Sequence, residues 1–85
     1  MDILGALDVL DIDLIPVTTN NVSGIGYHKG RNILAIGMND GHLYYYMGVP
    51  KDHYDELLKY TENDISLNSY ISKFIKGNYR FIQIR

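Results

Sequence analysis

Residues 41–50 contain three consecutive tyrosines, Tyr44, Tyr45 and Tyr46, followed by a Gly-Val-Pro break at 48–50. Neighbouring side chains of a β-strand point to opposite faces, so Tyr44 and Tyr46 share one face and Tyr45 lies on the other. A tyrosine combines a large apolar ring with a polar tip, so it can anchor a core or, when exposed, stack on a base or a partner protein. The chain must therefore place aromatic rings on both faces of one strand.

Turn signals divide the first half of the chain into short extended segments. Strands are expected at 21–28 and 32–38, joined by a turn at 29–31. The Asn-Asp-Gly sequence at 39–41 is a strong hairpin signal, because Asp-Gly readily adopts positive φ, and it introduces a third strand at 42–47. These segments predict an antiparallel meander.

After Pro50 the apolar period changes from two residues to three or four, as in Tyr54, Leu57 and Leu58. This spacing predicts a helix at about 51–60. Asp64 is the expected N-cap of a second helix over 65–76, which Gly77 and Asn78 end. A last strand near 79–84 is expected to pair with the meander.

The N-terminal residues show weaker patterns. Residues 2–8 predict a short helix, and Leu10, Ile12 and Leu14 alternate with Asp11 and Asp13 as in a half-buried strand. Pro16 suits the edge or the end of that strand. The fold class predicted for the chain is therefore α+β: an antiparallel β-meander, two helices packed on one face, and a C-terminal strand that returns to the sheet.

Length and composition limit the class of protein. The 85 residues, of which 46% are hydrophobic, form one domain with one core. A domain of this size buries only about 60–65% of its unfolded surface, so self-association into a homo-oligomer would add burial. The chain has no cysteine, no apolar run long enough to span a membrane, and no basic start typical of a signal peptide. A soluble cytoplasmic protein without membrane partners is expected.

Charge is distributed unevenly along the chain. The formal net charge is −2, yet residues 65–85 include no acidic residue and four basic ones, Lys73, Lys76, Arg80 and Arg85. This segment predicts an anion site, and the alternative is a solvated surface whose charges point in several directions. A small phosphorylated ligand needs only about two or three donors, whereas long RNA needs a broader basic surface.

Motifs for catalysis or metal binding are not evident. The three histidines, His28, His42 and His53, lack the spacing of a zinc site, so no metal is expected. The Gly24-x-Gly26 pair reads as strand glycines that permit the close approach of a bulky group such as a tyrosine ring. The serines at 66, 69 and 72 have no base in an activating motif. The chain is therefore expected to be a non-enzymatic protein without a cofactor.

Asn68 is an unusual polar residue for a helix. Its amide could read the edge of a base, or it could tie the helix to the meander by bonding a strand carbonyl.

The tyrosines also leave two alternatives. Tyr44 and Tyr46 form core if they lie on the helix-covered face, which makes Tyr45 or Tyr27 the exposed ring.

From residue 14 onward the chain resembles the KTSC domain family, a small module named for the C-terminus of some lysyl-tRNA synthetases and also found as a stand-alone bacterial and phage protein. The resemblance rests on IPVTTNNVSGIGY at 15–27, the Tyr-x-Tyr of Tyr44 and Tyr46, Gly-Val-Pro at 48–50, Tyr54 with Leu57-Leu58, Asn68 with Ile71, and KGNY at 76–79. It predicts a family domain at 14–85 after an N-terminal extension at 1–13. For function, the resemblance implies RNA binding.

Two features depart from the family pattern. Residues 72–75 are additional to the usual spacing, and about four extra residues should lengthen a helix by one turn without rotating its faces. The basic residues of the C-terminus are also fewer than in the family, which weakens the inference to a polyanion such as RNA.

These observations predict a non-enzymatic protein that binds a nucleotide-like, phosphate-bearing ligand. The expected ligand-binding residues are Tyr27, Tyr44, Tyr45 and Tyr46 for stacking, Asn68 for hydrogen bonding, and Lys73, Lys76, Arg80 and Arg85 for charge. By analogy with small phage proteins, a homo-oligomer could sequester a nucleotide signal. The alternatives are an RNA-binding accessory domain, which would bind short RNA, and a protein-interaction module.

Overall fold

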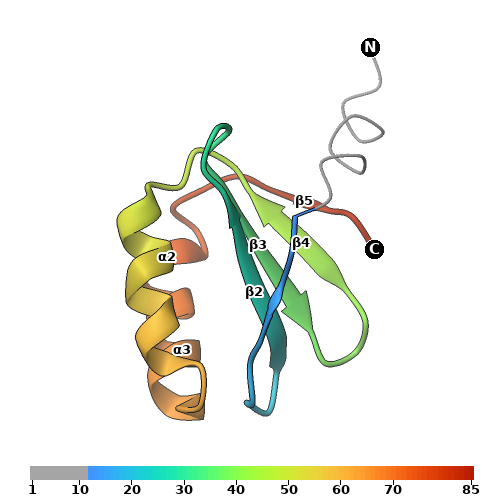
Figure 1. Cartoon of the computed structure of the whole chain (residues 1–85), viewed down its shortest axis with the longest axis vertical. Helices are drawn as coiled ribbons and strands as arrows, with labels where there is room; N and C mark the ends of the chain where they lie inside the picture. The colour runs from blue at the N-terminus through green and yellow to red at the C-terminus, as the bar shows by residue number, and fades with distance from the viewer. Residues whose placement is uncertain (1–11) are drawn as a thin grey trace.

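The structure is a computed structural model, and it describes residues 12–85. Five strands form one antiparallel sheet in chain order: β1 (Ile15–Pro16), β2 (Val22–His28), β3 (Ile33–Met38), β4 (Leu43–Tyr46) and β5 (Phe81–Gln83). The helical segments are α2 (Lys51–Leu57), the 3-10 turn η1 (Leu58–Tyr60), α3 (Asp64–Tyr70) and the π-helical turn η2 (Ile71–Ile75). The helices form a layer on one face of the sheet, so the predicted α+β fold is confirmed (Figure 1).

The meander follows the turn signals of the sequence. The turn before β4 contains Gly41 at φ 95°, a left-handed conformation that glycine adopts without strain. β5 pairs with β4, which places Gln83 opposite Tyr44 and Phe81 opposite Tyr46. The expected C-terminal strand is confirmed, and the chain reaches it by returning from the helical layer (Figure 1).

The N-cap of α3 differs from the prediction. The side chain of Asn63, not that of Asp64, accepts a hydrogen bond from the Ser66 main-chain N–H at 3.0 Å. The Asp64 carboxylate instead accepts bonds from Asn20, at 2.9 Å from both the main-chain N–H and the side-chain amide. Asp64 is therefore a tether between α3 and the loop before β2.

The second helix does not continue as a regular α-helix. Residues 71–75 form a π-helical turn that ends where the Lys76 main-chain N–H donates to the Ile71 oxygen, five residues back, at 2.8 Å. Ile71 and Ile75 are both buried. The additional residues 72–75 thus lie in a wider turn rather than in one more α turn, which corrects the expectation of unchanged helix faces.

The main core lies between the sheet and the helices. Its buried members come from β2, β3 and β4, from the loops beside them and from α2, α3 and η2: Val17, Val22, Ile25, Leu34, Ile36, Tyr46, Val49, Leu57, Leu67, Ile71 and Ile75. Burial of these side chains drives the helical layer onto the sheet.

A second apolar cluster covers the opposite face of the sheet, with Ile33, Ala35, Leu43 and Tyr45 buried. The strand glycines of this face lie against the segment before β1, not against a tyrosine ring. A Cβ atom added to Gly26 would overlap the Asp13 carbonyl, and one added to Gly24 would lie 3.1 Å from the Leu14 side chain. The segment before β1 therefore crosses the sheet along its glycines.

The N-terminal predictions are met only in part. Of the strand expected around residues 10–14, positions 10 and 11 lie outside the described residues, and positions 12–14 are not in a strand. The described strand β1 comprises Ile15 and Pro16 and pairs with β2 at the sheet edge. Pro16 therefore lies on an edge strand, where a missing N–H is tolerated. The predicted helix at 2–8 lies outside the described residues.

Candidate functional site

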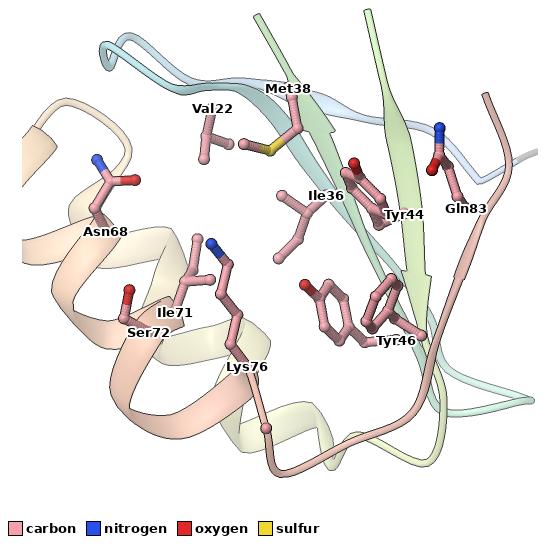
Figure 2. Close-up of a pocket in the computed structure, with 12 residues that line it drawn as sticks. Val22, Ile36, Met38, Tyr44, Tyr46, Asn68, Ile71, Ser72, Lys76 and Gln83 are labelled. Carbon is pink, nitrogen blue, oxygen red and sulfur yellow. The ribbon is translucent and has the colours of Figure 1, made fainter. Parts of the chain in front are cut away.

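A pocket with a cavity volume of about 480 Å³ lies between the helix-facing side of the sheet and the α3–η2 helix (Figure 2). Four strands, α3, η2 and the two residues after η2 contribute its lining: Val22, Ile36, Met38, Tyr44, Tyr46, Asn68, Ile71, Ser72, Lys76, Gly77, Phe81 and Gln83. Small-molecule sites in proteins have volumes of about 300–1,000 Å³, so this pocket has the size of a ligand site.

The sheet side of the pocket is aromatic. The Phe81 ring centroid lies 5.7 Å from that of Tyr44, edge-on, and 5.6 Å from that of Tyr46, tilted by 40°. Phe81 is 57% exposed, so much of its ring is open to a ligand. Burial raises the pKa of Tyr46 above its ordinary value, and the nearby Tyr44 raises it further.

The helix side of the pocket is polar. Asn68 in α3, Ser72 in η2 and Lys76 directly after η2 follow one another at four-residue intervals and border the pocket (Figure 2). Lys76 is the first residue after η2 with an extended backbone, and Gly77 at φ 81° turns the chain toward β5. The Lys76 ammonium group points into the pocket (Figure 2).

The structure brings together four of the nine predicted site residues. Tyr44 and Tyr46 lie on the sheet side, and Asn68 and Lys76 lie on the helix side of the same pocket. Tyr46 is buried and packs in the core as well, so the expected core role and a place in the pocket wall are combined in this residue. These residues come from segments more than 20 positions apart in the chain.

The other two predicted tyrosines lie outside the pocket. Tyr45, expected to be an exposed ring, is only 3% exposed and belongs to the apolar cluster on the opposite face. Tyr27 is half-buried and stacks on Tyr54 at 5.5 Å between ring centroids, while its hydroxyl donates to the Val49 oxygen. Both rings are engaged within the fold, which corrects their assignment as free stacking platforms.

Three predicted cations also lie outside the pocket lining. Lys73 is on another side of the helix, with its ammonium 5.5 Å from the centre of the Phe74 ring. Arg80 and Arg85 are exposed at the two ends of β5, and their main-chain oxygens accept bonds from Met47 and Leu43. The basic segment thus supplies one lining cation, Lys76, and the remaining charges are dispersed.

Asn68 does not bond a strand carbonyl, which was one of its two expected roles. Its amide nitrogen donates at 2.8 Å to the main-chain oxygen and at 2.8 Å to the carboxylate of Asp64 in its own helix, not to a strand carbonyl. It is connected to the meander indirectly, because Asp64 holds Asn20.

The residue-level prediction missed Phe81, Gln83 and Ser72. Phe81 and Gln83 share the face of Tyr44 and Tyr46 through the β4–β5 register. Positions 81 and 83 of the strand expected near 79–84 share one strand face, but the pairing partner of that strand was needed to bring them to this pocket. Ser72 lies one turn after Asn68, and that spacing was the available signal.

The fold and the pocket together define a small α+β domain with an aromatic-lined pocket between its sheet and its helices. The chain belongs to the KTSC domain family, whose profile matches residues 18–79. This match confirms the family resemblance noted in the sequence.

A solved structure of similar fold is the KTSC domain protein YPO2434 from Yersinia pestis. The two chains are 23% identical and superpose with a TM-score of 0.74 over 87% of this chain and 99% of that one. At 23% identity, this similarity is evidence for a shared fold alone. A search of curated protein sequences found no significant match. Within residues 12–85, no helix is long and apolar enough to cross a membrane.

Proposed function

We propose that this chain is a non-enzymatic binding protein whose pocket holds a nucleotide-like ligand with a single phosphate group. The observation that carries the proposal is the convergence of accessible aromatic rings and one cation, Lys76, on the same cavity. Aromatic stacking contributes about 1–3 kcal/mol per base, and a charge-assisted bond to phosphate adds to it.

The composition of the lining favours a monophosphate. Among the lining residues, all within the described range 12–85, one is cationic and none is acidic. One ammonium group, together with the Ser72 hydroxyl of the same lining, suits a terminal phosphate better than the larger charge of a triphosphate. Because the lining residues also include no histidine or carboxylate to act as a base, binding is favoured over catalysis.

RNA binding is less well supported by the same charges. A protein that follows an RNA backbone neutralises several phosphates along its path. Here Lys73 lies on another side of the helix from Lys76, and Arg80 and Arg85 lie outside the pocket lining. An enclosed mononucleotide uses only the cation that faces it.

The test is a thermal-shift panel with AMP, cyclic AMP, ADP and short RNA oligomers, run at low and high salt. A ligand that binds only the folded state raises the melting temperature, and we expect AMP to do so with a gentle salt dependence. A steeply salt-dependent shift with RNA alone would indicate an RNA-binding domain. No shift with any of these compounds would overturn the proposal and favour a protein-interaction module.

Two matched variants locate the site. Lys76→Gln removes the lining cation, and we expect it to weaken AMP binding roughly 10- to 100-fold, the range of a charge-assisted bond. Lys73→Gln makes the same change on another side of the helix and should leave the affinity within about twofold. Equal affinities of the two variants would contradict a site at Lys76.

Sequestration of a nucleotide by a homo-oligomer remains a prediction. It requires a multimer in solution at the concentrations at which the ligand binds. Light scattering of the protein with and without AMP tests it, and a monomer under both conditions would exclude this mode of action.

A further inference from the structure

The side-chain amide of Asn68 has one orientation that the fold permits. Its nitrogen donates to the main-chain oxygen and to the carboxylate of Asp64, each at 2.8 Å. Both partners are acceptors only, so a flipped amide would lose two hydrogen bonds and bring oxygen against oxygen. The Asn68 oxygen is therefore directed to the sheet side, toward the pocket (Figure 2).

Contacts from a distant part of the chain hold Asp64 in place. One carboxylate oxygen accepts the Asn20 main-chain N–H and the other accepts the Asn20 side-chain amide, each at 2.9 Å. Asn20 precedes β2, 44 residues before Asp64. The direction of the Asn68 amide is thus set by the assembled fold before any ligand enters.

Gln83, on the β5 side of the pocket, also has its amide nitrogen bonded within the fold. Its amide nitrogen lies 3.1 Å from Nδ1 of His42 and 3.3 Å from the Arg85 main-chain oxygen. The oxygen of Gln83 is left on the side of Tyr44 (Figure 2). Both amides of the lining therefore present acceptors, and a matching ligand must supply donors.

The order of groups along the helix indicates which part of a nucleotide meets Asn68. Asn68 lies in α3, Ser72 in η2 and Lys76 directly after η2, so the three side chains border the pocket in this order. Phosphate, ribose and base also follow one another in a fixed order in a nucleotide. With the phosphate at Lys76, the edge of the base reaches Asn68.

From this geometry we infer that the pocket selects bases that carry an exocyclic amino group, as in 6-aminopurines and 4-aminopyrimidines. The inference rests on the proposed function, because it names the ligand class of that same pocket. A base without the amino group leaves the Asn68 oxygen unpaired beside apolar side chains, and sites built around a hydrogen bond discriminate strongly against such analogues.

The experiment compares AMP with purine riboside 5′-monophosphate, which lacks only the amino group, by calorimetric titration of the full chain. We expect AMP to bind at least about 10-fold more tightly. Deoxy-AMP, which lacks the 2′-hydroxyl, should bind like AMP. Equal affinity for AMP and the analogue, or a loss confined to deoxy-AMP, would overturn the inference while the proposed function stands.

The variant Asn68→Leu keeps a similar volume without the acceptor. In this variant we expect AMP and its amino-free analogue to bind within about twofold of each other. A persistent preference for AMP would show that another group reads the base and would contradict the role of Asn68. The comparison of AMP with its amino-free analogue uses the unaltered protein, so it does not depend on whether a variant folds. If neither nucleotide binds that protein, the proposed function itself fails.

Discussion

At the scale of single residues, three adjacent tyrosines occupy three different environments. Tyr44 is half-buried at the pocket, Tyr46 is buried in the main core while lining the same pocket, and Tyr45 is buried in the cluster on the far face. Strand alternation separates Tyr45 from its neighbours. The apolar residues on the far face then decide that Tyr45 is buried rather than exposed.

His53 is a second residue whose environment the sequence did not indicate. Its Nδ1 lies 2.8 Å from the Tyr70 hydroxyl and its Nε2 lies 3.1 Å from the Tyr79 hydroxyl. A neutral imidazole donates from one nitrogen and accepts at the other, so both contacts are hydrogen bonds. His53 thereby links α2 to α3 and to the segment before β5.

We expect His53→Ala to lower the free energy of unfolding by about 2 kcal/mol, because two partly buried hydrogen bonds and ring packing are lost. Urea denaturation measures this change. His28→Ala is the matched control, since Nδ1 of His28 only accepts the Arg31 main-chain N–H in an exposed turn, and its cost should be under about 1 kcal/mol. Equal costs for the two variants would contradict a bridging role of His53.

At the scale of elements, the π-helical turn and the glycine after it determine where Lys76 lies. The turn ends at the bond from Lys76 to Ile71, and Gly77 then adopts φ 81°. A wider turn shifts the residues that follow it around the helix axis, and such turns often occur at functional sites. The end of this helix therefore contributes directly to the pocket.

Gly77→Ala tests this link between an element end and the site. A Cβ at Gly77 meets nothing within 4 Å, so the expected cost of about 1 kcal/mol is backbone strain alone. Gly41→Ala is the matched control, with φ 95° and equally open space in the turn before β4. Thermal melts should show similar losses of stability, whereas calorimetry should show weaker AMP binding only for Gly77→Ala. Unchanged AMP affinity in both variants would contradict a role of the Gly77 conformation in the site.

At the scale of the whole molecule, the tyrosines connect stability to alkaline pH. Burial is the main cause that raises the pKa of Tyr27, Tyr46, Tyr54 and Tyr70 above the ordinary value of 10.0. For Tyr60 the main cause is its hydrogen bond to the Glu56 carboxylate, at 2.6 Å. In the folded protein these hydroxyls hold their protons to higher pH than in the unfolded chain.

The sign of the effect follows from linkage. Stability from these groups is complete below pH 10 and falls as the pH rises from there through the higher folded pKa values, because the unfolded chain ionises first. Urea denaturation at pH 8, 9.5 and 10.5 should show a falling midpoint, with tyrosinate absorbance appearing later in the native protein. Tyr46→Phe should make the fall shallower. A midpoint that is constant over this range would contradict the prediction.

Much of the architecture was predictable because it depends on local chemistry. The Asn-Asp-Gly turn, the alternation in the strands and the apolar spacing after Pro50 each act over a few residues, and the meander, the helices and the final strand are where these patterns placed them. Tyr44, Tyr46, Asn68 and Lys76 were likewise identifiable as candidates from residue type. The capping of α3 by Asn63 was not, because Asp64 is drawn instead to Asn20.

The order and kind of the elements, and the presence of aromatic, amide and basic groups, follow from the sequence. Which of these groups share a cavity depends on contacts between distant parts of the chain. Phe81 reaches it by pairing with Tyr46, and the Asn68 oxygen faces it because Asp64 is held across 44 residues. Such contacts join residues far apart in the chain, so their geometry exists only once the sheet and the helices have packed together.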